Sequence, residues 1–172
     1  MKAAALALVL AALLGACAPA ARPPTLSTPL DTESAIASGN PPRFLYELAK
    51  EHYSDSELQQ RDLPLTFTVE LASTDRAMWG VGWCAKTQAI LEDNLEQIVM
   101  AFWINGQPVP LEQFYIQQEG TGCSTWQMVV SNWPKGVTTL KQEMTLANPI
   151  NDGWNQFDAG QHMVHIFEVT VP

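Results

Sequence analysis

The sequence has few of the residues on which most enzymes depend. It contains three histidines and three cysteines in 172 residues. We find no Gly-x-Ser-x-Gly elbow, no His-Glu-x-x-His zinc motif and no phosphate-binding loop. His162 and His165 are three positions apart in an expected strand, so their side chains should point to opposite faces and not share a metal. The sequence therefore predicts a protein that is not an enzyme and has no cofactor or metal.

Basic residues are also scarce, at nine Lys and Arg against eighteen Asp and Glu. Lys2 is the only charged residue before Cys17, so the chain from Cys17 onward carries eight basic and eighteen acidic residues, a formal charge of −10. Affinity for nucleic acid comes largely from Lys and Arg that neutralise phosphates. This charge therefore argues against a nucleic-acid partner, and against docking on anionic lipid through a basic patch.

The longest apolar run, residues 3–13, is too short for a membrane-spanning helix, which needs about 20 residues. A basic start, a short apolar core and small residues before a cleavage site are secretory features. The residues that follow, Leu14-Gly15-Ala16-Cys17, resemble the lipobox of bacterial lipoproteins. The resemblance implies a signal peptide over residues 1–16 and a lipidated Cys17. The lipid would anchor the protein to a membrane of the cell envelope, and the protein would face the periplasm or the cell exterior. The alternative is an ordinary signal peptide with an incidental cysteine.

Residues 17–42 are rich in Ala, Pro, Ser and Thr, a composition that cannot bury a core. Six of the twelve prolines lie there: Pro19, Pro23, Pro24, Pro29, Pro41 and Pro42. We expect a disordered tether over residues 17–42. The helical spacing of Phe44, Leu45, Leu48 and Ala49 then predicts a short helix near 43–53.

From about residue 63 onward, the pattern is typical of β-strands. Alternation or apolar runs predict strands over residues 65–71, 78–84, 98–104, 114–118, 125–130, 138–146 and 162–171. Asn105-Gly106 is a strong hairpin signal, and the only later helical interruption is short, around residues 90–96. We therefore expect residues 43–172 to form a mainly β domain, an antiparallel β-sandwich of about seven strands.

The end of the chain resembles the last two strands of many bacterial immunoglobulin-like domains. The resemblance depends on residues 136–140, the loop 151–153, Gly160 and residues 167–171, together with the Asn105-Gly106 turn, and covers residues 63–172. It implies an immunoglobulin-like sandwich used for display, adhesion or ligand recognition. The two cysteines of this region do not have the spacing that is usual in such domains.

Lipidation of Cys17 would leave Cys84 and Cys123 as an even pair in an oxidising compartment. We predict that they form a disulfide, which would tie residues 79–84 to residues 121–130. Closing a loop of about 39 residues stabilises by roughly 4 kcal/mol in the chain-entropy treatment. The alternative is two free thiols.

Six tryptophans are many for this length. Four lie in expected strands and are predicted to be mostly core, whereas Trp133 and Trp154 lie in expected loops. Exposed loop aromatics can stack on a sugar ring or anchor a protein contact. We therefore expect a binding site at Trp133, Trp154, Asp152 and Tyr115 if the fold brings them together. The alternative is that each tryptophan packs over its own loop.

Together these features predict a lipid-anchored binding or display protein of the cell envelope, with a protein or a glycan as ligand. One alternative is a carbohydrate-binding module that uses the loop tryptophans. Others are an envelope hydrolase with an unrecognised acidic site, and a small inhibitor or assembly factor. The oxygen-rich loop 148–158 is either ordinary turn chemistry or a calcium site.

Overall fold

The computed structural model describes residues 22–51, 53–54, 64–120 and 122–172. The predicted signal peptide, residues 1–16, and the predicted lipid site Cys17 lie outside the described residues. The described helices are α1 (Pro29–Ala37), α2 (Leu45–Lys50) and α4 (Gln88–Leu95), with a 3-10 turn η1 at Leu111–Gln113. The described strands are β1 (Thr25–Leu26), β2 (Leu65–Glu70), β3 (Ala77–Cys84), β4 (Ile98–Ile104), β5 (Gln107–Val109), β6 (Tyr115–Glu119), β7 (Cys123–Ser131), β8 (Gly136–Leu146), β9 (Ile150–Asn151), β10 (Gln156–Phe157) and β11 (His162–Val171).

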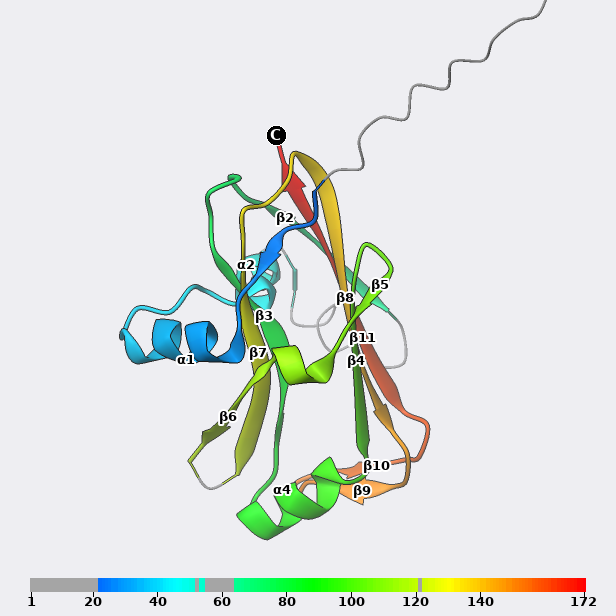
Figure 1. The fold of residues 1–172 in the computed structure, drawn as a ribbon. Coiled ribbons are helices and arrows are strands. Elements are labelled where there is room, and N and C mark those ends of the chain that lie inside the picture. Colours follow the sequence, from blue (N-terminus) through cyan, green and yellow to red (C-terminus); the bar gives the residue numbers. More distant parts are fainter. Residues whose placement is uncertain (1–21, 52, 55–63, 121) are drawn as a thin grey trace, which may run out of the picture.

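The strands form two sheets that face each other, as Figure 1 shows. One sheet has the order β2-β11-β8-β4-β5. In the other, β7 is central, with β3 along one edge and with β6 and β1 along the other. All pairs in the two sheets are antiparallel except β2 with β11, which is parallel. The prediction of a mainly β sandwich is confirmed.

Alternation places one face of each long strand in the core. On β8 the even-numbered side chains from Thr138 to Leu146 are buried, and on β11 Phe167, Val169 and Val171 are buried. The two sheets meet through aromatic rings, because Trp79 on β3 contacts Phe102 on β4 edge to face at 5.3 Å between centroids. Each such fully buried side chain stabilises the fold by roughly 1.5–3 kcal/mol.

The Asn105-Gly106 hairpin forms as predicted. Both residues have positive φ, 49° and 77°, as the favoured two-residue hairpin turn requires. The turn joins β4 to β5, with Ile104 opposite Gln107. One tryptophan departs from the core prediction: Trp103 lies on the outer face of its sheet, where the Lys141 ammonium sits 4.4 Å from the ring centroid.

Helix α2 fills the side of the sandwich between β3 and β2. Its residues Leu45 and Ala49 are buried in the common core, with 1% and 0% of their surface exposed. The helix is shorter than the predicted 43–53 because Phe44 is still extended and forms a parallel bridge with Met78 of β3. Helix α4 matches the predicted interruption near 90–96 and begins at a Thr87 cap. None of the described helices has the length and apolar character needed to cross a bilayer.

The prediction of a tether over residues 17–42 is wrong for its described part, residues 22–42. Strand β1 pairs with the end of β7, and α1 begins with a capping box in which Thr28 and Asp31 exchange hydrogen bonds. Pro29 occupies the first turn of this helix, where its missing N–H costs nothing. Thr32 is fully buried against β7. The composition suggested disorder, but Thr28 and Pro29 are helix-start residues, and the ordered elements begin at Thr25.

The predicted disulfide between Cys84 and Cys123 is confirmed. The two cysteines are direct cross-strand partners on β3 and β7, with 4.1 Å between their Cα atoms. The bond therefore lies within one sheet, whereas an immunoglobulin disulfide crosses between the two sheets. The orders β3-β7-β6 and β11-β8-β4-β5 correspond to the B-E-D and G-F-C-C′ orders of that fold. The immunoglobulin-like part of the prediction stays a prediction.

Candidate functional site

The structure places Trp154 and Asp152 in one turn and keeps Trp133 and Tyr115 apart from them. Trp133 is buried, with 2% of its surface exposed, and its indole N–H donates to the backbone oxygen of Asp75 at 3.1 Å. Its backbone N–H donates to Ser73, so the residue closes the loop between β2 and β3. The expectation of an exposed Trp133 is therefore wrong, because the ring packs under its own loop and into the core.

Trp154 and Asp152 lie in the β9–β10 turn, at the opposite end of β3 from Trp133. The turn is held against that end by the N–H of Lys86, which donates to the backbone oxygen of Asp152 at 2.7 Å. Trp154 is 63% exposed, as predicted for a loop aromatic. Tyr115 is half-buried on β6, opposite Gln127 in the middle of β7. Since β3 spans eight residues, about 25 Å, the two tryptophans cannot share a ligand of ordinary size.

The carboxylate of Asp152 stabilises the turn in which it lies. Its Oδ1 accepts from the N–H groups of Trp154 and Asn155 at 2.7 and 2.6 Å. Burial alone would raise the pKa of Asp152, but these hydrogen bonds outweigh it and lower the pKa below its usual value. Among the residues that the structure describes, no group of three or more His, Cys, Asp or Glu side chains could hold a metal. Within loop 148–158, the side chains of Asn151 and Asp152 accept from backbone N–H groups two residues further on, which is Asx-turn chemistry.

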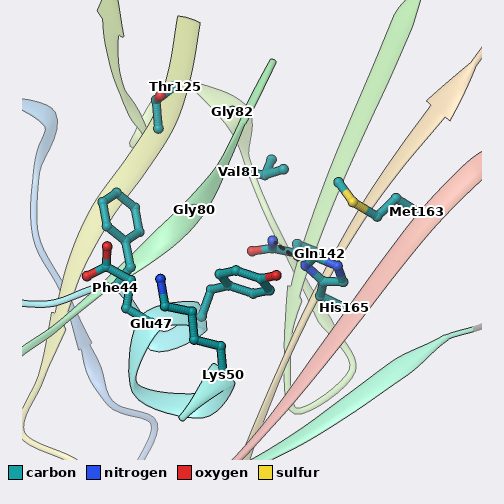
Figure 2. A pocket seen from close by; sticks show the side chains of 11 residues that line it. Phe44, Glu47, Lys50, Gly80, Val81, Gly82, Thr125, Gln142, Met163 and His165 are labelled. Atoms are coloured by element: carbon teal, nitrogen blue, oxygen red, sulfur yellow. Dashed lines mark hydrogen bonds between the residues drawn. The ribbon is translucent and has the colours of Figure 1, made fainter. Parts of the chain in front are cut away.

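A pocket of about 480 Å³ lies elsewhere, where α2 meets the edge of β3 and the inner faces of β8 and β11 (Figure 2). This volume suits a small ligand or one or two peptide side chains. The pocket is lined by Phe44, Tyr46, Glu47, Lys50, Gly80, Val81, Gly82, Thr125, Gln142, Met163 and His165. We call it the α2–β3 pocket. It holds one carboxylate, that of Glu47, and not the acidic pair that the hydrolase alternative requires.

Gln142 and His165 form a buried polar pair on the inner wall of the pocket. They are opposite each other on β8 and β11, and 3% and 8% of their surfaces are exposed. The amide nitrogen of Gln142 lies 3.3 Å from Nδ1 of His165. The amide oxygen of Gln142 is buried and has no hydrogen-bond partner. Figure 2 shows this oxygen turned away from His165, toward the space between the labelled side chains.

The environment of His165 keeps its ring neutral. Burial lowers the pKa of His165 to about 4, because the charged form loses its hydration. The ring also stacks on Tyr46, with 5.6 Å between centroids, and contacts Phe67 edge to face. Since the amide of Gln142 donates, the neutral ring accepts at Nδ1 and carries its proton on Nε2. The wall therefore offers neutral hydrogen-bonding groups and no positive charge of its own.

The sequence carried a signal for this pair that the motif search did not use. Inward positions on β8 and β11 are otherwise mainly apolar, such as Leu140, Met144 and Phe167. Gln142 and His165 interrupt that pattern at paired positions. A buried polar group needs a partner or a function, so the interruption marks a candidate site once the two strands are aligned.

The comparisons with known proteins give no family. No protein-family model matches the chain, and no curated protein matches it. Among solved structures, the chain is similar to PbICP-C in complex with falcipain-2 (11% identity, 64% of this chain and 90% of that chain, TM-score 0.38). It is also similar to the cysteine protease inhibitor EhICP2 from Entamoeba histolytica (12% identity, 62% of this chain and 92% of that chain, TM-score 0.34). A third similar structure is the Plasmodium falciparum protein Pf12p (8% identity, 63% of this chain and 42% of that chain, TM-score 0.35). TM-scores this low identify neither a family nor a function.

Proposed function

We propose that this chain is a non-catalytic, lipid-anchored protein of the cell envelope that binds a protein partner at the α2–β3 pocket. The lipobox residues, from Leu14 to Cys17, support the anchor. The bond between Cys84 and Cys123 fits the oxidising compartments outside the cytoplasm.

The observation that carries the binding site is the unpartnered amide oxygen of Gln142. A buried acceptor without a hydrogen bond costs about 1–3 kcal/mol. A ligand that donates a hydrogen bond to this oxygen would remove that cost on binding. The surrounding residues Phe44, Val81 and Met163 supply the apolar contact that a bound side chain needs.

The anchor is tested by the intact mass of the mature protein, produced in a bacterium with its own signal peptide. We expect a mature N-terminus at Cys17 with the added mass of acyl chains. The variant Cys17→Ser should lose that mass and leave the membrane fraction. A mature N-terminus elsewhere, without lipid, would refute the anchor.

The binding site is tested by photocrosslinking in intact cells. A benzophenone amino acid replaces Lys50, which is exposed at the pocket, or Glu92, which is exposed on α4 as a control. We expect a discrete crosslinked protein from position 50, absent from position 92 and reduced by Gln142→Met. Equal labelling from both positions, or none from position 50, contradicts the proposal.

A second candidate is glycan binding through Trp154, because this aromatic side chain is 63% exposed at the tip of a turn. A glycan array distinguishes the two candidates. Signal that disappears in Trp154→Ala and persists in Gln142→Met would favour a carbohydrate-binding module and displace the pocket.

A further inference from the structure

The outer edge of β3 has backbone groups that no described strand pairs. Met78 and Val129 face each other, and both direct their backbone groups away from the β3–β7 pair: Met78 N–H donates to Arg43 at 2.9 Å, and Val129 bonds to Ser27. They are therefore a non-hydrogen-bonded pair of the antiparallel ladder. Because the pattern alternates, Gly80, Gly82 and Cys84 also direct their N–H and C=O groups to the free edge.

The chain itself shows that this edge accepts another strand. Arg43 and Phe44 run parallel to β3 and bridge it at Met78. Helix α2 then turns the chain into the sandwich at Leu45, and no strand among the described residues pairs with the edge beyond Met78. Gly82 and Cys84 are both exposed. Natural sheets usually protect such an edge with a charged residue, a proline or a covering segment.

The α2–β3 pocket opens directly beside this edge, since Gly80, Val81 and Gly82 line it. Successive side chains of an added strand would point to opposite faces. One would enter the pocket toward Gln142, and its neighbours would lie over Gly82 and Thr125. Gly80 is explained by packing alone, because a Cβ there would collide with the backbone of Trp126, whereas the orphaned oxygen of Gln142 has no such explanation.

We infer that an extended peptide segment of a protein partner adds as a strand to the edge of β3 from Gly80 to Cys84, with one N–H-bearing side chain in the α2–β3 pocket. This inference rests on the proposed function and names its partner's chemistry. The chain from Cys17 onward carries a formal charge of −10, which favours a basic side chain, Lys or Arg, in the partner; at the pocket itself the carboxylate of Glu47 is accompanied by the ammonium of Lys50. Main-chain hydrogen bonds supply affinity, and the pocket supplies specificity.

A second copy of this chain is the other possible occupant of a free edge. Charge disfavours it, because two mature chains, each with a formal charge of −10, repel each other. Sedimentation of the purified protein tests this point directly. A dimer that Gly82→Pro abolishes would show that the edge serves self-association, and would overturn the inference.

The main test uses a displayed library of random linear peptides as the probe, with the full mature domain as the target. We expect selected peptides to be extended and to contain Lys or Arg at one fixed position. Each amide of the best peptide is then N-methylated in turn. Strand addition predicts an alternating pattern, in which methylation at every second position weakens binding about tenfold or more and the intervening positions change it little. A library that yields no binder, or a scan without alternation, overturns strand addition.

Variants of β3 test the same edge from the protein side. Gly82→Pro removes an N–H that points to the free edge of β3. It removes no hydrogen bond between β3 and β7, because the N–H of Gly82 points away from β7. Gly82→Ala is the matched control, because its Cβ meets the same Thr125 hydroxyl, at 2.9 Å, and its N–H is kept. We expect about a tenfold loss of peptide binding in Gly82→Pro and under threefold in Gly82→Ala. Equal binding by the two variants overturns the inference, and if Gly82→Pro does not fold, the N-methyl scan decides alone.

The two proposals fail in different ways. If the crosslink from position 50 persists and the N-methyl scan shows no alternation, the pocket binds a partner but not through strand addition. If the crosslink is absent, the proposed function itself is refuted.

Discussion

His165 should make the stability of this protein depend on pH over a defined range. Burial lowers the pKa of His165 to about 4 in the folded protein, against 6.5 in the unfolded chain. Between these values the unfolded chain binds a proton that the folded protein does not, so stability rises with pH. The contribution of His165 to the free energy of unfolding is fully present above pH 6.5 and is lost as the pH falls to 4. The difference corresponds to about 3 kcal/mol.

The test is urea denaturation at several values between pH 4 and 7.5 for the wild type, His165→Phe and His162→Phe. Phenylalanine at 165 keeps a ring against Tyr46 and Phe67 but cannot titrate. It also leaves the amide of Gln142 without its partner, which lowers stability at every pH by about 1–3 kcal/mol. The informative quantity is therefore the change in the free energy of unfolding between pH 4 and pH 7.5. We expect this change to be smaller by about 3 kcal/mol in His165→Phe than in the wild type, and not in His162→Phe. His162→Phe is the control, because it removes an exposed histidine of the same strand. Parallel pH profiles for the wild type and His165→Phe, or an NMR titration of His165 near 6.5, would refute the reasoning.

Three further predictions concern the scaffold. Replacing Cys84 and Cys123 by Ser should lower the free energy of unfolding by roughly 4 kcal/mol, because the bond closes a 39-residue separation, and an unchanged urea midpoint would contradict this. Trp133→Ala should cost about 3–5 kcal/mol and Trp154→Ala less than about 0.5 kcal/mol, as the first ring is buried and the second exposed; calorimetric melting of both variants checks the contrast. Thr32→Val should destabilise by about 1 kcal/mol, since its hydroxyl bonds to Ser27 and to the backbone of β7, whereas a true tether would tolerate the change.

The β-sandwich was predictable because hydrophobic alternation follows strand geometry. Strand β8 shows why: Leu140, Met144 and Leu146 point inward and Lys141 and Glu143 outward, as a period of two requires. The hairpin at Asn105 was predictable for an equally local reason, the need for two positive φ angles. Both features depend on neighbours in the sequence.

The errors came where distant contacts decide the outcome. Pro29 and Thr28 belong to a composition typical of linkers, yet their order specifies a helix start that β7 then stabilises. Trp133 follows a strand and precedes a proline, which is typical of a loop residue. Its indole N–H nevertheless donates to the backbone oxygen of Asp75 in the β2–β3 loop, 58 residues away in the sequence. The α2–β3 pocket is lined by residues of α2, β3, β7, β8 and β11, five segments that only the fold brings together, so no local pattern could have defined it.

The free edge of β3 lies between two fixed points, and this matters for binding. At one end Met78 is held by Arg43 and Phe44, and at the other Cys84 is bonded to Cys123 on β7. An edge strand paired on one side only would otherwise fray, and a peptide would have to order it at an entropic cost. With both ends held, the backbone groups from Gly80 to Cys84 are already extended before a partner arrives. Preorganisation of this kind raises affinity without any new contact, so the disulfide supports the site that it borders as well as the stability of the sheet.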